Sequence, residues 1–290
     1  MPNHSLAAAG VTARIKSHGG ELCSLTAPDG TELIWQAHPA WPRHSPILFP
    51  IVGTLRDNRY RHAGKTYELG RHGFAREAQF DWVARSASTA HLVLVSNPAT
   101  RAVYPFEFRF EVFYALGSDG LTSTYRITNT GESVLPASMG AHPAFNWPLR
   151  PGIAKTDHRL EFASPEPAPI RRIRRDGLLR PDPLPTPVEG STLALHDGLF
   201  AEDAIIFDHP VSTSVRFTTP GAPVVEVSWQ GFTELGIWNP VGVDLLCIEP
   251  WYGVSDPIDY DGYLMGKPFI HHIAPGASLA ASHSIRVIQA

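Results

Sequence analysis

The chain has 290 residues, of which 43% are hydrophobic, and it carries a formal net charge of −4. A chain of this length can bury enough apolar surface to fold without disulfides or a structural metal. The mild charge and the lack of a long basic face exclude nucleic acid and membrane surfaces as favoured partners.

No targeting or spanning segment is predicted. Residues 1–16 lack the basic start and long apolar core of a secretory signal. No uninterrupted apolar run reaches the roughly 18 residues of a transmembrane helix. The two cysteines, Cys23 and Cys247, have apolar neighbours, which favours buried reduced thiols over a bridge or a metal site. We therefore expect a soluble cytoplasmic protein.

Short β-strands are predicted along the whole chain. Residues 21–35 contain two strand-like segments around the turn signal Pro28-Asp29-Gly30. From Phe106 to Val112, apolar residues alternate with charged ones, which places the apolar side chains on one face of a strand. Asp119-Gly120 is a hairpin signal between two further segments. Other predicted strands are HLVLVS, AIIFDH, TSVRFTT, VVEVSWQ, LGIWN, DLLCIE and the closing HSIRVIQA.

The strand pattern predicts the fold class. Proline and glycine are frequent, and no amphipathic helix of useful length is found. Many short strands with frequent turn signals predict an all-β fold, namely a large antiparallel sandwich or barrel. Because no repeat or linker divides the chain, we predict a single domain over residues 1–290.

Residues 164–190 differ from the rest because they are rich in proline and contain four closely spaced arginines. These are Arg171, Arg172, Arg174 and Arg175. One interpretation is a solvated loop that crosses the surface. The other is an anion-attracting rim beside a pocket for a sugar phosphate, because the guanidinium fork binds phosphate well.

Three stretches combine ionisable groups with aromatic and turn residues: residues 70–77, 139–149 and 245–256. In the third, Glu249 follows the apolar run LLCI, so we expect it at the end of a buried strand and only partly solvated. Burial raises the pKa of a carboxyl and makes it a better base near neutral pH. An ion pair with a buried arginine such as Arg76 explains Glu249 equally well.

The histidines of the other two stretches also have two interpretations. In MGAHPAFNWPL, His142 stands between turn-forming residues and is either a buried histidine bonded to a backbone carbonyl or an acid–base group. His72, between Arg71 and Gly73, is either a turn residue or a catalytic one. Tryptophans in predicted loops suit stacking on sugar faces but are common in cores. They are Trp35, Trp147, Trp238 and Trp251.

Several other kinds of site are disfavoured. His271 and His272 are adjacent, so on a strand they face opposite sides. No HxH or HExxH spacing is present, and neither are a GxSxG elbow, a phosphate-binding glycine loop or a dinucleotide fingerprint. We therefore expect no metal and no cofactor.

Together, four segments in this order resemble the aldose 1-epimerase (galactose mutarotase-like) family. They are HGFAR at 72–76, GAHPAFNWPL at 140–149, LFAEDAIIF at 199–207 and IEPWYGVSD at 248–256. The resemblance runs from about residue 10 to the C-terminus. It implies a large β-sandwich with a shallow polar cleft, and interconversion of the α and β anomers of a free sugar without metal or cofactor.

The resemblance also implies roles for individual residues. His142 matches the general acid and Glu249 the general base, while His72 matches a helper to the acid. Arg76 and Asp203 match ligands of the sugar hydroxyls. At the start of anomer exchange, Glu249 must be ionised and His142 protonated. This requires a lower pKa for Glu249 than for His142, and the mutual attraction of the two charges favours that order.

The chain departs from the family pattern in one place. Many relatives carry an arginine directly after the glycine in the stretch resembling FPIVGTLRDNRY, where Thr54 stands here. Either Arg56 or Arg59 replaces it from a shifted loop, or the substrate is held differently. Arg56 is assigned to substrate binding. Trp238 is assigned to the sugar face.

Three functions therefore stay open. The first is a free-hexose 1-epimerase, the second is a hexose-6-phosphate mutarotase, and the third is a non-catalytic sugar-binding protein on the same fold. A small-molecule sugar is the expected partner, and the chain is expected to be a monomer or a homodimer.

Overall fold

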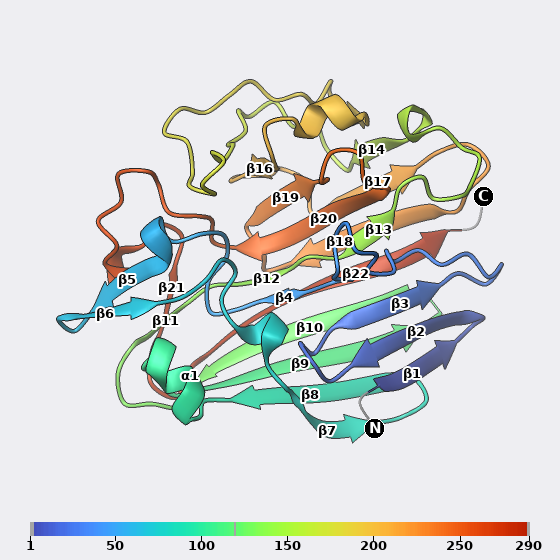
Figure 1. Ribbon diagram of the computed structural model, residues 1–290. Helices are drawn as coiled ribbons and strands as arrows, with labels where there is room; N and C mark the ends of the chain where they lie inside the picture. Colours follow the sequence, from blue (N-terminus) through green and yellow to red (C-terminus); the bar gives the residue numbers. More distant parts are fainter. Residues whose placement is uncertain (1–2, 119, 289–290) are drawn as a thin grey trace.

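The computed structural model describes residues 3–118 and 120–288, and it confirms the all-β fold. Within these residues, all paired strands run antiparallel and one short α-helix, α1 (Pro98–Val103), is present. The nine-stranded sheet extends from β7 to β14 and β15 (Figure 1). In spatial order its strands are β15 (Thr192–Ala194), β14 (Arg159–Phe162), β17 (Ser214–Thr218), β18 (Val224–Gln230), β22 (Ser278–Ile288), β10 (Gly120–Asn129), β9 (Phe108–Gly117), β8 (Thr89–Val95) and β7 (Asp81–Arg85).

A second, smaller sheet carries three of the four motif segments, all but the one at residues 72–76. Its order is β16 (Ile205–Phe207), β19 (Glu234–Trp238), β20 (Leu245–Tyr252), β12 (Met139–Ala141) and β4 (Ile47–Leu48), and β13 (Ala144–Asn146) also pairs with β20. An N-terminal sheet of β1 (Asn3–Ala8), β2 (Val11–Lys16) and β3 (Leu22–Thr26) packs β1 against β8 and β9.

The remaining elements are short. Two-stranded ladders join β5 (Arg59–His62) to β6 (Lys65–Glu68) and β11 (Leu135–Ala137) to β21 (His271–Ile273). Single 3-10 turns occur at Arg56–Asn58, Ala75–Glu77, Lys155–Asp157, Asp197–Phe200 and Leu264–Gly266.

The predicted alternation in the 106–112 stretch is confirmed in β9. Phe108, Phe110 and Val112 are buried, and Phe110 stacks on Phe49 with ring centroids 4.5 Å apart. These aromatic contacts join the nine-stranded sheet to the segment that follows β4. Asp119 of the predicted hairpin lies outside the described residues, but β9 and β10 on either side of it pair as expected.

Most other predicted strands are present, and the DLLCIE strand is longer than expected. β20 continues past Glu249 through Pro250 to Tyr252, so the expectation that Glu249 ends a strand is wrong. The strand continues because Trp251 has partners on both sides, Glu234 of β19 and Gly140 of β12. Glu249 is therefore held at both flanks by regular structure and is 1% exposed.

Residues 164–190 are only partly the solvated loop that one interpretation expected. Arg171 and Ile206 of β16 exchange backbone hydrogen bonds, so this segment is fastened along the edge of the smaller sheet. Arg172 is buried and donates to the carbonyl oxygens of Asp203 and Leu199. Arg174 and Arg175, in contrast, are exposed.

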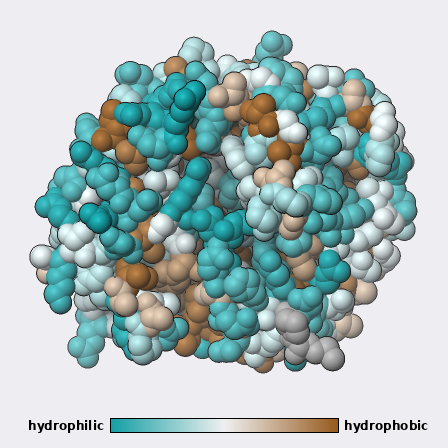
Figure 2. Space-filling view, viewed as in Figure 1, coloured by the Kyte–Doolittle hydropathy of each residue, from teal (hydrophilic) through white to brown (hydrophobic). Residues whose placement is uncertain are grey.

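The visible surface in Figure 2 is mostly hydrophilic, and its hydrophobic side chains lie in several separate small groups. In the part of the chain that the structure describes, no helix is both long and apolar enough to cross a membrane. The cytoplasmic location stays a prediction.

Candidate active site

The register of β20 places His142 directly beside Glu249. Gly140 in β12 lies opposite Trp251, and Ala144 in β13 lies opposite Cys247. The same register carried through the two-residue gap between β12 and β13 sets His142 opposite Glu249. The gap is where Pro143 stands, which cannot donate to a ladder. The strand pairing is thus interrupted at residues 142 and 143, and the imidazole of His142 lies across from the carboxyl of Glu249.

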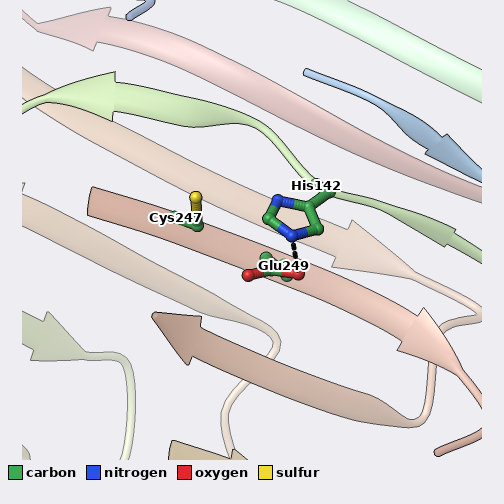
Figure 3. Close-up of side chains that lie close together, drawn as sticks. All are labelled: His142, Cys247 and Glu249. Carbon is green, nitrogen blue, oxygen red and sulfur yellow. Dashed lines mark ion pairs between the residues drawn. The ribbon is translucent and has the colours of Figure 1, made fainter. Parts of the chain in front are cut away.

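Alternate residues of β20 face the same side of the sheet, so Cys247, Glu249 and Trp251 form one row. Figure 3 shows Cys247 and Glu249 on one strand, with His142 reaching toward the carboxyl from the neighbouring segment. His142 Nε2 lies 3.1 Å from Glu249 Oε2, and the two side chains are 9% and 2% exposed. The two groups predicted to carry the chemistry are therefore in direct contact.

Burial controls the charge of this pair. It raises the pKa of Glu249 well above its ordinary value, against the opposing effect of Arg71. It also lowers the pKa of His142 to about 3, and the positive charges of Arg71, Arg76 and Arg43 act in the same direction. The expected order of the two pKa values is wrong for the unliganded protein, because desolvation of both groups outweighs their attraction. In the unliganded pair a proton therefore favours Glu249 over His142.

His72 is held in a strained turn at the same cavity. Its φ is +66°, and the ring is buried. The Gly53 amide donates to Nδ1 at 3.1 Å, and Arg71 Nε donates to Nε2 at 3.2 Å. An N–H donor therefore lies against each nitrogen of the ring, which disfavours the doubly protonated form. Burial is the main cause that lowers the pKa of His72, and the positive charge of Arg71 lowers it further, so the ring stays neutral.

The structure brings Arg76 to the site but not Arg56. Arg71 and Arg76 line a cavity of about 150 Å³ together with His72, His142 and Glu249. Burial is the main cause that lowers the pKa of Arg76 to about 10, and repulsion from the charge of Arg43 is the second cause. The alternative in which Arg76 forms an ion pair with Glu249 is not found, since its carboxylate neighbour is Glu77 at 3.9 Å.

The assignment of Arg56 to substrate binding is corrected. The chain after Gly53 is tied to residues 255–256, because the Arg56 amide donates to Asp256 Oδ2 and the Asp256 amide donates to the Thr54 carbonyl. Arg56 and Arg59 consequently line a different cavity, beside Tyr260. Arg71, which sequence reasoning did not assign to the site, lines the cavity of His142 and Glu249, and its position next to His72 was the available signal.

Aromatic side chains form the walls of the cavity. Trp238, at the end of β19, and Trp251 both line it. Trp41 also lines it and stacks on His142, with ring centroids 5.4 Å apart and planes inclined by 25°. Sequence reasoning missed Trp41, because nothing in the 27–46 connection indicates that it folds back over residue 142.

Asp203 borders a second, adjoining cavity of about 410 Å³. The two cavities share Trp238 as a wall, and Asp203 is close enough to Glu249 to raise the pKa of that carboxyl. Three arginines, Arg174, Arg175 and Arg180, line the second cavity. Part of the arginine-rich segment therefore faces the cleft, as the rim interpretation expected.

A family model described as aldose 1-epimerase matches residues 3–257. The chain belongs to the aldose 1-epimerase family. The plasmid-encoded protein LacX of Lactococcus lactis subsp. lactis is 31% identical over 289 residues, covering 96% of this chain and 97% of the relative. The predicted galactose mutarotase-like fold is thus confirmed. The assignment of the chain to a single domain stays a prediction.

Solved structures agree with this assignment. A galactose mutarotase related enzyme from Lactobacillus acidophilus is 32% identical, with a TM-score of 0.90, over 99% of this chain and 97% of that one. A galactose mutarotase-like protein from Lactobacillus casei is 27% identical, again with a TM-score of 0.90, over 98% and 99% of the two chains. The aldose 1-epimerase fold of this chain is therefore shared nearly from end to end with both.

Proposed function

We propose that this protein is an aldose 1-epimerase that interconverts the α and β anomers of a free hexose or a related monosaccharide. The observation that carries the proposal is the contact between His142 Nε2 and Glu249 Oε2 at 3.1 Å on the wall of a small cavity. Ring opening removes a proton from O1 and adds one to O5, two oxygens bonded to the same carbon. An acid and a base for this reaction must therefore be neighbours.

The pair contains the single proton that the reaction needs. Glu249 as base takes the O1 proton, and His142 as acid protonates O5, so the C1–O5 bond breaks and an aldehyde forms. Rotation about C1–C2 and the reverse transfers give the other anomer. Before the first step the shared proton passes from Glu249 to His142, which a bound polar sugar favours by replacing lost solvation. Cys247 has no part in this cycle.

His72 is proposed to orient the sugar rather than to exchange a proton. Arg71 Nε donates to His72 Nε2 at 3.2 Å, so the two side chains hold each other at the cavity wall, where a sugar hydroxyl is proposed to contact them. Arg76 and Asp203 are proposed to hold other hydroxyls, and Trp41 and Trp238 to contact the sugar faces.

Polarimetry tests the proposal. Freshly dissolved α-D-glucose and α-D-galactose are followed with and without the protein, and acceleration of either change in rotation supports it. A protein that binds these sugars by calorimetry without accelerating the change would instead be the non-catalytic sugar-binding protein. Absence of both binding and acceleration with a wider panel of aldoses would contradict the proposed function.

A second candidate is a mutarotase for a sugar with an anionic substituent, such as a hexose 6-phosphate. The arginine-lined cavity beside Trp238 favours it, because guanidinium groups bind phosphate bidentately. Two of these arginines have nearby carboxylates: Arg180 is 3.0 Å from Glu202 and Arg174 is 3.2 Å from Asp176. Arg175 has no ion-pair partner among the described residues.

Exchange NMR with glucose 6-phosphate separates the two candidates. If the phosphate is bound in this cavity, Arg175→Ala raises KM for the phosphorylated sugar and leaves KM for glucose unchanged. Arg59→Ala, in the separate cavity, is the matched control and leaves both unchanged. Equal KM values for the two sugars in the wild-type protein would remove this candidate.

A further inference from the structure

Cys247 adds a third metal-binding type of side chain to the His142–Glu249 pair. It lies two residues before Glu249 on the same face of β20, and its cross-strand neighbour Ala144 is two residues after His142. The thiol sulfur, a ring nitrogen and a carboxylate oxygen all lie within 4.8 Å of one another. All three residues are buried, and Figure 3 shows them gathered at one point of the strand.

We propose that Cys247, His142 and Glu249 form a binding site for a thiophilic divalent cation, with Zn²⁺ as the best fit, and that the bound ion blocks the site. The donor set is one sulfur, one nitrogen and one oxygen, which suits zinc and not magnesium or calcium. Three protein ligands leave a fourth position for water or another small ligand. Because His142 and Glu249 line the cavity, the ion has a path of entry. The metal site does not depend on the proposed epimerase function, and only the inhibition rests on it.

The geometry needs only a modest adjustment. Zinc binds sulfur at about 2.3 Å and nitrogen or oxygen at about 2.0–2.2 Å, so tetrahedral ligand atoms lie roughly 3–4 Å apart. The His142–Glu249 distance of 3.1 Å already falls in this range. Side-chain rotations of the thiol and the carboxyl are sufficient to bring the largest separation, at most 4.8 Å, into it.

Charge balance also favours a divalent ion. Zn²⁺ binds with loss of one proton from the Cys247 thiol and one from the Glu249 carboxyl, so a cation of charge +2 meets two single negative charges. The resulting cluster is neutral and avoids the cost of burying one isolated charge. Because binding releases these two protons, it strengthens as pH rises.

Groups packed around the site modify this affinity. Arg71, Arg76 and Arg43 act on His142 or Glu249 as positive charges and oppose a cation, while Asp203 favours it. His72 stays neutral and contributes little charge. Among residues 3–118 and 120–288, His142 Nδ1 has no hydrogen-bond partner, so no carboxylate or carbonyl there fixes the imidazole as in dedicated zinc enzymes. We therefore expect a reversible, inhibitory site rather than a permanent structural one.

Cobalt absorption gives a test that does not depend on activity. Co²⁺ is added to the full-length protein in chelator-free buffer, and thiolate ligation is read from charge-transfer absorption in the near ultraviolet. We expect this absorption to saturate at one equivalent, to increase with pH and to disappear when Zn²⁺ is added. Cys247→Ala and Cys247→Ser should both lack it. Cys23→Ala, which removes the other buried thiol, should retain it.

Activity provides the second measurement if the epimerase reaction is observed. Zn²⁺ should inhibit the wild-type protein, EDTA should restore it, and Cys247→Ala should keep its basal rate with an inhibition constant more than about tenfold higher. The proposal is overturned if Co²⁺ gives no thiolate absorption, or if Cys247→Ala leaves the absorption or the zinc sensitivity unchanged. A protein inactive on every sugar would fail the proposed function, and the cobalt measurement would still decide the metal site.

Discussion

Trp41 stacks on His142, although the two residues are about one hundred positions apart in the chain and belong to different segments of the fold. The indole covers one face of the imidazole and contributes to its burial. Because burial is the main reason for the low pKa of His142, the loop residue controls the charge of a proposed catalytic group.

Replacing Trp41 should therefore change a pKa as well as sugar binding. Trp41→Ala opens His142 to water, and we expect the pKa of the ring to rise from about 3 toward its ordinary value of 6.5. The pKa is measured by NMR titration of the ring carbon signals. Trp41→Phe keeps an aromatic cover and should shift the pKa much less. An unchanged His142 titration in Trp41→Ala would show that the indole is not part of the desolvating wall.

Removing the proposed base should abolish turnover without removing the binding site. Glu249→Gln keeps the shape and the hydrogen-bonding capacity but cannot take a proton. We expect kcat to fall by about 10²–10⁴-fold while sugar affinity stays within a few-fold. Glu234→Gln is the matched control: Glu234 is also a buried glutamate, in β19, and accepts a hydrogen bond from the Gly253 amide. Near-normal rates in Glu249→Gln would rule out the mechanism.

The pH dependence of kcat/KM should lack an acidic limb near the ordinary histidine pKa. The pair takes up a second proton only near the pKa of about 3 of His142, and it loses its single proton only above the raised pKa of Glu249. We thus expect no acidic limb in kcat/KM between the pKa of about 3 of His142 and the raised pKa of Glu249. A fall in kcat/KM centred at about 6.5 would mean that His142 titrates as an exposed histidine.

A histidine remote from the chemistry should affect stability at acidic pH. Burial lowers the pKa of His283 in β22 to about 4, so the unfolded chain binds a proton more readily than the folded one. The free energy of unfolding is therefore unaffected by protonation of His283 above pH 6.5 and decreases as the pH falls toward 4. The total decrease is about 3 kcal/mol. Urea unfolding at both ends of this range should give a smaller loss of stability for His283→Leu than for the wild type. Equal losses would place the titrating group elsewhere.

Two glycines should prove intolerant of a methyl group. A Cβ at Gly236 would overlap the ring of Trp251, and one at Gly140 would come within 2.6 Å of it from the other side. We expect Gly236→Ala to cost about 1–3 kcal/mol by overpacking and to lower kcat/KM, because Trp251 lines the cavity. Gly70→Ala has open space around it and serves as control. A wild-type melting curve for Gly236→Ala would contradict this packing.

Much of the fold could be predicted because it depends on local pattern. The VVEVSWQ run became β18 with the expected limits, since alternation of period two is visible within seven residues. The extension of β20 past Pro250 could not be predicted, because proline is a strand-ending signal by itself and only the partners of Trp251 on both sides override it.

The site was predictable to the extent that motifs carry it. His72, Arg76, His142 and Glu249 line one cavity, and Asp203 and Trp238 border the adjoining one. Arg56 was misplaced because its direction is set by contacts with residues 255 and 256, two hundred positions away. Trp41 and the approach of Cys247 to the pair depend on the tertiary arrangement of loops and registers, which no local spacing reveals.

The two glycines beside Trp251 also restrict how the smaller sheet can assemble. A slip of β20 by one residue would turn Cys247, Glu249 and Trp251 to the opposite face of the sheet. A slip by two would keep the face but move the indole away from Gly140 and Gly236, against neighbours that have side chains. The absence of two side chains thus selects one alignment of three strands, and His142 and Glu249 are brought together as a consequence of that selection.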